Sequence, residues 1–227
     1  NIRLNQPVLY LRRDGDTWSI GRLFKRERSE ADRQGPARSI AIDDIGVTDG
    51  SVVIDGAVGT SGVELPKRFD RLDAKLSFRY EPVRYSVEIA NVSFRGSDPA
   101  IALNALSGGV SVRNDTVFVD QLAVRTAETS LTLDGAVEQY LTRPIFKVQL
   151  TSDKFSLPEF APLVPSLSGI SLQPAFELKL NGPMDGLGVD MNVRASAGQV
   201  TGNVIADLMT PGRSVNGTIS VRHLDLA

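Results

Sequence analysis

The chain has 227 residues, and 25 Lys and Arg against 27 Asp and Glu give it a formal net charge of −2. Proteins that bind nucleic acid through its phosphates usually carry a basic excess, so this balance argues against that class. There is no Cys and only one His, which excludes disulfides and thiolate metal sites and makes a Ser-His-Asp triad hard to assemble. No window approaches the roughly 18 consecutive apolar residues of a membrane helix.

The sequence begins and ends within an alternating pattern, so we expect it to be a segment of a longer protein. Asn1-Ile2-Arg3-Leu4 opens the chain and Leu224-Asp225-Leu226-Ala227 closes it, with no start methionine and no charged-then-apolar signal at the front.

Alternation of apolar and polar residues predicts strands along almost the whole chain. In the clearest run, residues 72–80, every even position is apolar or aromatic and every odd position is polar. The alternation resumes at 83–89 and then slips by one residue, which predicts a bulge or a new strand. Asp49-Gly50 predicts a turn between strands at 40–42 and 52–58.

Roughly fourteen strands of ordinary length are expected in total. The later ones lie at 131–137, 146–151, 176–181, 189–194, 200–208 and 215–221. Helical signals are scarce: a short helix is conceivable within 17–28, and a single turn within 157–165. Residues 25–38 are charged and contain Pro and Gly, which indicates a solvated loop. Turns are predicted at Asp14-Gly15, Asn114-Asp115, Asn181-Gly182-Pro183, Ala197-Gly198 and Pro211-Gly212.

The shortage of helices limits the ways in which the apolar strand faces can be covered. Two sheets could face each other in a β-sandwich, or one sheet could close into a barrel. The third solution is a long, curved, mainly antiparallel sheet whose apolar concave face holds something other than protein. Alternation alone does not separate these three all-β folds. We expect one elongated domain over 1–227, with possible sub-modules at 1–66 and 67–227.

No group of residues predicts catalysis, a metal site or a cofactor. Acidic residues before or near Gly are typical of hairpin turns, and their spacing does not match a calcium-binding loop. The Gly-containing stretches Ser107-Gly108-Gly109 and Gly186-Leu187-Gly188 lack the Lys-Ser/Thr of a phosphate loop and are interpreted as strand ends. His223 is interpreted as a packed or surface residue. We therefore expect a protein that is not an enzyme. The acidic residues considered are Asp43, Asp44, Asp49, Asp55, Asp185 and Asp190.

Four stretches resemble the AsmA family and its TamB-like relatives. The first is a strand with an internal Pro, followed by an Arg-Asp-Gly turn, an aromatic residue and a Leu, and the second is an alternating segment after a charged loop. The third runs through the middle of the chain, and the fourth is a Pro-rich turn. The stretches are spread from residue 2 to residue 165, and the resemblance extends over nearly the whole chain, although the family's membrane anchor is absent and no exact repeat is visible. The stretches are residues 2–23, 40–55, 100–135 and 157–165.

This resemblance implies a protein of the bacterial cell envelope. AsmA-like proteins are anchored in the inner membrane by an N-terminal helix, and their periplasmic body is a repeating β-groove. They are thought to carry phospholipid between the inner and outer membranes, which supports outer-membrane biogenesis. The implied location is the periplasm, and the implied partner is phospholipid or another acyl-chain lipid, with further envelope proteins possible and no nucleic acid. The alternative is a structural or protein-binding β-sandwich that acts in envelope assembly.

A groove of this kind would be lined by the apolar residues that share one face of the predicted strands. Such a lining retains acyl chains outside a bilayer because each buried CH₂ contributes about 0.8 kcal/mol. The expected lining residues are Leu72, Leu76, Phe78, Tyr85, Val87, Ile89, Leu131, Leu133, Phe146, Val148, Phe176, Leu178, Leu180, Met191 and Val193.

Overall fold

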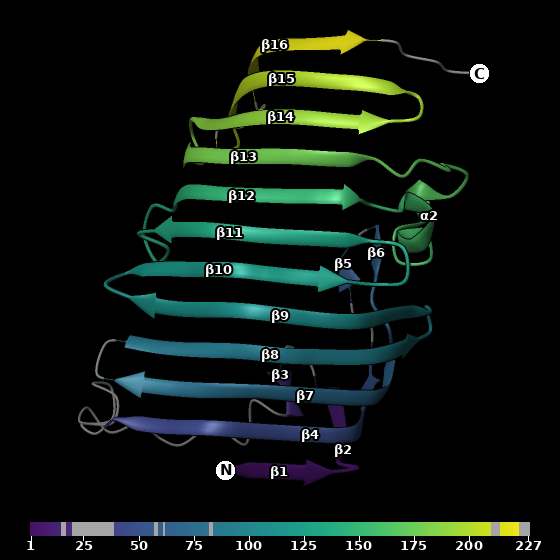
Figure 1. The fold of residues 1–227 in the computed structure, drawn as a ribbon, viewed down its shortest axis with the longest axis vertical. Coiled ribbons are helices and arrows are strands. Elements are labelled where there is room, and N and C mark those ends of the chain that lie inside the picture. Colours follow the sequence, from purple (N-terminus) through teal and green to yellow (C-terminus); the bar gives the residue numbers. More distant parts are fainter. Residues whose placement is uncertain are drawn as a thin grey trace.

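One large β-sheet dominates the protein. The computed structural model describes residues 1–14, 17–19, 39–56, 59–60, 62–81, 84–209 and 214–222. In these residues fourteen strands pair in the order β16-β15-β14-β13-β12-β11-β10-β9-β8-β7-β4-β2-β3, with β1 beside β4 (Figure 1). Each strand from β7 to β16 neighbours the next in the chain, which gives an antiparallel meander; β1 and β2 are parallel to β4.

The strands of the large sheet vary from two to sixteen residues in length. They are β1 (Ile2–Asn5), β2 (Val8–Asp14), β3 (Thr17–Trp18), β4 (Ile40–Asp55), β7 (Arg68–Glu81), β8 (Arg84–Ser97), β9 (Ile101–Arg113), β10 (Thr116–Arg125), β11 (Ser130–Glu138), β12 (Ile145–Lys154), β13 (Ala175–Pro183), β14 (Leu187–Ala195), β15 (Gly198–Asp207) and β16 (Ser214–Arg222). A separate hairpin pairs β5 (Gly59–Thr60) with β6 (Val63–Glu64). Two short helical turns, α2 (Leu157–Phe160) and η2 (Pro165–Leu167), follow β12.

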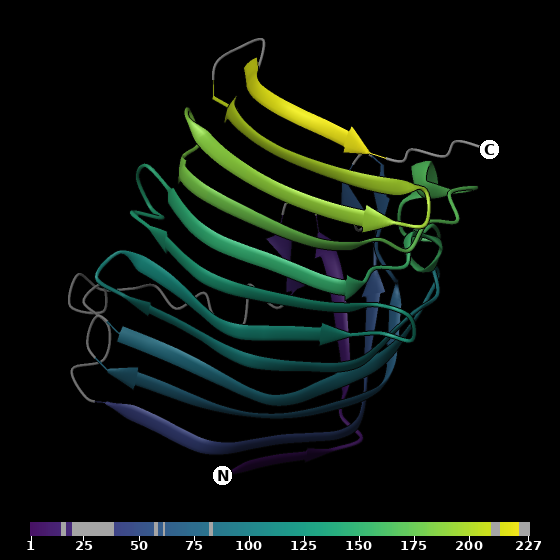
Figure 2. The ribbon, with the colours of Figure 1, turned by 45° about the horizontal axis from the view of Figure 1, so that its top comes forward.

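The predicted long, curved, mainly antiparallel sheet is confirmed. Its outermost strands, β16 and β3, do not pair with each other, so the sheet is open and not a barrel. The described strands do not form a second large sheet that could make a sandwich with it. Figure 2 shows the strands curving across the sheet. The division into sub-modules at residue 66 stays a prediction.

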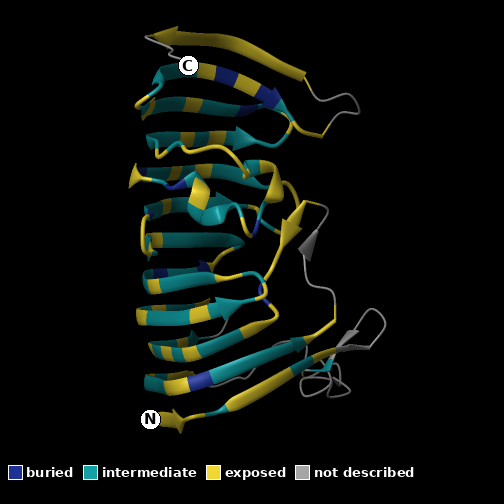
Figure 3. Ribbon diagram, turned by 90° about the vertical axis from the view of Figure 1, so that its right-hand side faces the viewer, coloured by how far each residue is buried: buried dark blue, intermediate teal, exposed yellow. Residues whose placement is uncertain are grey.

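A line of bulges bends the long strands β4, β7 and β8. The pairing of β4 with β7 shifts on both sides of Gly50, and the pairing of β7 with β8 shifts between Asp70 and Asp73. Asp49 and Arg71 adopt positive φ values of 50° and 52° at these shifts. Extra residues in one strand increase its bend and twist, so the far ends of these strands turn away from the rest of the sheet. We call the concave side of this bent, curved sheet the trough; Figure 3 shows the bent strands from the side.

Two predictions of strand breaks were wrong for related reasons. Asp49-Gly50 is not a turn between two strands, because β4 continues through it to Asp55 with a bulge in place of a hairpin. Ser107-Gly108-Gly109 is not a strand end but lies inside β9, where Gly108 has a φ of 131° opposite a bulge in β10. In both places a residue with positive φ bends a continuous strand.

Most other predicted elements are found at their expected positions. The slip after Ile89 is a bulge within β8, and Asn114-Asp115 is a turn in which both residues have positive φ. The turn expected at 181–183 lies slightly later, since β13 continues to Pro183. The loop at 25–38, Gly15 of the predicted Asp14-Gly15 turn, Pro211-Gly212, His223 and nearly all of the helix considered at 17–28 fall outside the described residues. Asp14 ends β2, and Thr17 and Trp18 form β3.

Candidate functional site: an apolar sheet face

The strand register joins the apolar side chains of one face into continuous rows. Residues directly opposite each other on neighbouring strands point to the same face of a sheet. The central row crosses eleven strands, from β4 to β16, without a break in the pairing. It consists of Ile42, Phe78, Val87, Val110, Val119, Gly135, Val148, Leu180, Val189, Val204 and Gly217.

A second row runs beside the central one, two residues along each strand. From β10 to β16 it is again paired without interruption, and beyond the bulge at Gly108 it continues to β1. Adjacent strands lie about 4.8 Å apart, so the ten intervals of the central row span about 48 Å. The second row from β10 onward consists of Leu122, Leu133, Leu150, Leu178, Met191, Gly202 and Ile219.

All fifteen residues expected to line a groove lie on this one face. Their pairings connect them to each other or to further apolar residues and Gly, as in Phe78 opposite Val87 and Leu150 opposite Leu178. At the margins Tyr85 stands opposite Tyr80, and Phe176 stands opposite Ser152 and Val193. Whether these side chains contact lipid stays a prediction. Sequence reasoning left out Val110 on β9. It also left out Val117, Val119, Leu122 and Val124 on β10, whose alternation is interrupted by the bulge in that strand.

This apolar face has little protein covering it. Among the described Ala, Val, Leu, Ile, Met and aromatic side chains, five are exposed by 9% or less: Val112, Leu163, Leu187, Val204 and Ala206. A closed core in a chain of this length would bury many more. The rows become more exposed toward the last strand, where Val215 is 66% and Ile219 56% exposed. The face is therefore an open apolar surface bordered by protein.

The border on one side is formed by the segment between β12 and β13, residues 155–174, which we call the flap. Two backbone hydrogen bonds close its base, from Phe155 to Pro174 and from Leu157 to Leu172. Phe160 stacks on Phe155 with 4.9 Å between ring centroids, and Phe155 meets Phe176 of the apolar face at 5.7 Å. The flap is thereby held against the end of that face (Figure 1).

The hairpin β5–β6 and the loop after it border the same side. The backbone N–H of Glu64 donates to the carbonyl oxygen of Leu163 at 2.7 Å, which joins β6 to the flap. Pro66 lies over Gly96, where an added Cβ would come within 2.9 Å of its ring. Because Gly96 is paired with Phe69 and Ile101, Pro66 sits on the apolar side of the sheet. The apolar face is thus the inner face of the trough.

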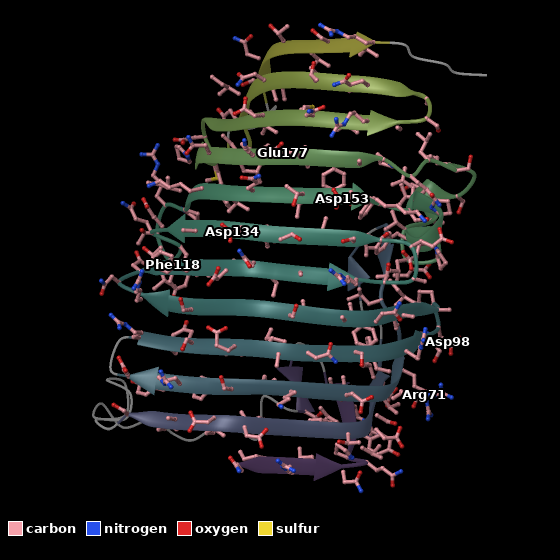
Figure 4. All side chains as sticks on the ribbon, in the orientation of Figure 1. Arg71, Asp98, Phe118, Asp134, Asp153 and Glu177 are labelled. Carbon is pink, nitrogen blue, oxygen red and sulfur yellow. The ribbon has the colours of Figure 1, made fainter. Side chains whose placement is uncertain are left out.

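The opposite face is polar and its charges are neutralised locally. Asp134, Gln149, Lys179, Asp190 and Asn203 form a row across β11 to β15, and Figure 4 shows Asp134 and Glu177 standing on this face. A hydrogen bond with Glu177 raises the pKa of Lys179, and Asn203 donates to Asp190. A hollow of about 430 Å³ lies over these residues. The charged and amide side chains of its lining already have polar partners, so it does not by itself indicate a ligand.

Several acidic residues considered in the sequence analysis form ion pairs with Arg side chains. Asp44 pairs with Arg3 at 2.9 Å, and the hydrogen bond from that guanidinium lowers the pKa of Asp44. Asp55 pairs with Arg12 and Asp185 with Arg143. In the described part of the chain no group of three or more His, Cys, Asp and Glu residues is placed to hold a metal ion. The described helices are also too short to cross a membrane.

Comparison with known proteins gives no family assignment. No family model, no curated protein and no solved structure matches this chain.

Proposed function

We propose that the apolar face binds the acyl chains of phospholipid and that the protein carries lipid between the inner and outer membranes in support of outer-membrane biogenesis. The observation that carries this proposal is the unbroken central apolar row from β4 to β16, on a face that the described protein leaves largely open. Such a surface is unfavourable in water, at about 25 cal/mol per Å² of apolar area. Acyl chains would remove that area from water along its whole length.

The resemblance of residues 2–23, 40–55, 100–135 and 157–165 to AsmA-like proteins supports the same proposal. We propose on the same basis that the protein acts in the periplasm, tethered to the inner membrane through an N-terminal anchor. Binding of acyl chains to a sheet face needs burial and shape but no catalytic group, metal or cofactor. We accordingly propose a carrier and not an enzyme, with phospholipid as its principal partner.

Variants on the two faces of the sheet test the proposal. Phe78 lies on the apolar face and its neighbour Ser77 on the polar face, opposite Glu88. We expect Phe78→Asp and Leu178→Asp to lose bound phospholipid, measured by native mass spectrometry and lipid extraction of the purified protein. Ser77→Asp and Thr132→Asp are the matched controls, and they should retain lipid. Circular dichroism would establish that all four variants are folded. A folded wild-type protein that takes up no lipid from detergent-solubilised phospholipid would contradict the proposal.

The exposed edge of β16 favours a second role in binding other proteins. Every residue of β16 is exposed, and among the described strands only β15 pairs with it. An unpaired edge offers backbone hydrogen-bonding groups to a strand from a partner, so a part in envelope assembly through strand addition is the alternative. A variant of the β16 edge that still binds lipid but no longer binds the partner protein would separate the two roles.

A further inference from the structure

Four cationic side chains stand at one end of alternate strands. Strands β10, β12 and β16 terminate in Arg125, Lys154 and Arg222, and Arg194 is the penultimate residue of β14. These four strands all run toward the same end of the sheet, the right-hand end in Figure 1. We call Arg125, Lys154, Arg194 and Arg222 the cationic rim.

The register places the rim residues in two close pairs. Arg125 and Lys154 are both opposite Ser130 on β11, and Arg194 and Arg222 are both opposite Gln199 on β15. Members of each pair are therefore two strands apart, or about 9.6 Å between their backbones. The flap emerges between the pairs, at the end of β12. Its Ile170 is 39% exposed, and Leu65, next to the β6 strand joined to the flap, is 43% exposed.

The four cations of the rim have no acidic partner, and neither do Arg71, Lys75, Arg95 and Arg113 elsewhere in the described sheet, so the rim is distinguished by the placement of its cations at one end of alternate strands. None of its four side chains has an ion-pair partner among the described residues, and all four are exposed. At the opposite strand ends, Arg143 pairs with Asp185 and Lys147 with Glu138, each at 2.6 Å. Arg95, near the end of β8, stands opposite Asp70 and is not counted with the rim.

The acidic groups near the rim are mostly engaged elsewhere. Glu159 accepts hydrogen bonds from Thr126, Ala127 and Glu128, and Glu128 itself accepts from Ser156 and Gln173. Asp153, beside Lys154, is exposed and has no hydrogen bond or ion pair to another described residue. The rim thus combines cations that form no ion pair with exposed apolar side chains on the flap, next to the carboxylates of Glu128, Asp153 and Glu159.

We infer that the cationic rim docks the protein on an anionic phospholipid bilayer, with the flap between its two pairs of cations facing the membrane surface. Unpaired Arg and Lys attract anionic head groups, and apolar side chains placed among them enter the interface. A nucleic-acid surface fits less well, because no described aromatic residue alternates with these four cations to stack on bases. This inference goes beyond the proposed function, since docking does not require lipid in the trough.

Vesicle binding tests the inference with a charge-matched control. The rim variant is the triple substitution Arg125→Gln, Arg194→Gln and Arg222→Gln, and the control is Arg79→Gln, Arg143→Gln and Lys147→Gln at the opposite strand ends. Each lowers the charge equally. We expect wild type to sediment with vesicles of phosphatidylcholine mixed with phosphatidylglycerol, and less so at high salt. The rim variant should bind about a hundredfold more weakly, at roughly fivefold for each cation, while the control stays within about threefold of wild type.

Further variants and competing ligands distinguish the possible results of the vesicle experiment. Asp153→Asn removes the remaining exposed acid and should strengthen vesicle binding. Equal losses in the two triple variants, equal binding to vesicles of phosphatidylcholine alone, or tighter binding to duplex DNA would overturn the inference. So would displacement by inorganic phosphate at constant ionic strength, because that would indicate single phosphate sites in place of a membrane surface. Phe78→Asp should keep vesicle binding even where bound lipid is lost, so this inference and the proposed function fail separately.

Discussion

The hydroxyl of Thr126 donates a hydrogen bond to the carboxylate of Glu159 at 2.5 Å, although the two residues are 33 positions apart. The backbone N–H groups of Ala127 and Glu128 donate to the other oxygen of the same carboxylate at 3.0 and 3.3 Å. One side chain of α2 thus organises the turn between β10 and β11. It also fixes the flap to the edge of the sheet.

Replacing Glu159 by Ala should destabilise the protein and loosen the flap. Three donors lose a charged acceptor, which we expect to lower the free energy of unfolding by about 2 kcal/mol. Urea denaturation measures the change, and faster proteolysis within 155–174 would locate it. Asp153→Ala, on the same edge but without such hydrogen bonds, is the control and should unfold like wild type. Equal stability of the two variants would contradict this account.

Gly135 is required by close contact between strands. It has a φ of 137°, and an added Cβ would strike the carbonyl oxygen of Lys147 and the Cα of Val148. We expect Gly135→Ala to lower the free energy of unfolding by more than about 2 kcal/mol, because backbone atoms cannot move aside as a flexible side chain can. Gly186→Ala meets nothing within 4 Å and should change stability by less than about 0.5 kcal/mol. Thermal unfolding of the pair provides the comparison.

The stability of the fold near the bend in the long strands should depend on pH through Asp70. A hydrogen bond from Arg68 lowers the pKa of Asp70, and Ser51 donates to the same carboxylate. A carboxyl whose folded-state pKa is depressed stabilises the fold above its unfolded-state pKa of about 3.9, and this stability is lost as the pH falls through the folded-state value. Wild type should therefore be more stable than Asp70→Asn at neutral pH, and the difference should shrink in acid. A difference independent of pH in urea titrations would argue against this origin.

The last strand should promote self-association of the isolated protein. All of β16 is exposed, and it carries no Lys, Pro or inward-facing charge of the kind that usually protects a free edge. Ile219→Lys would place a charge on the apolar side of that edge. We expect the substitution to reduce concentration-dependent association in sedimentation velocity without changing the circular dichroism spectrum. Thr218→Lys, on the polar side, should reduce it less.

The alternation of apolar and polar residues was enough to predict the strands that are regular. The run from Leu72 to Tyr80 shows this, since its apolar positions all fall on one face of β7. Alternation states which side chains share a face, but it does not state whether a second layer covers that face. The scarcity of predicted helices left a sandwich, a barrel or an open groove as the possible folds. The long-range register of the strands was needed to identify the open sheet.

Strand continuity was mispredicted where the backbone leaves the usual extended conformation. Asp-Gly is typical of a hairpin turn, yet Asp49 here donates its N–H to Asp73 on the neighbouring strand and β4 continues. The contact that decides this lies 24 residues away, so no local pattern contains it. The flap was foreseen only as a turn, because its packing depends on Phe155, Phe160 and Phe176 meeting across the fold.

The apolar rows run across the strands, so the length and the cross-section of the apolar surface depend on different features of the sheet. The central row runs across the strands, so its length is set by the number of strands at about 4.8 Å each. The width and depth of the trough are set by strand length and by the bulges near Gly50 and Gly108. Insertion or loss of one β-hairpin therefore changes the reach of the surface by about 10 Å and leaves its cross-section intact. Evolution can tune the span of such a molecule by duplicating hairpins, without redesigning the cross-section of its apolar surface.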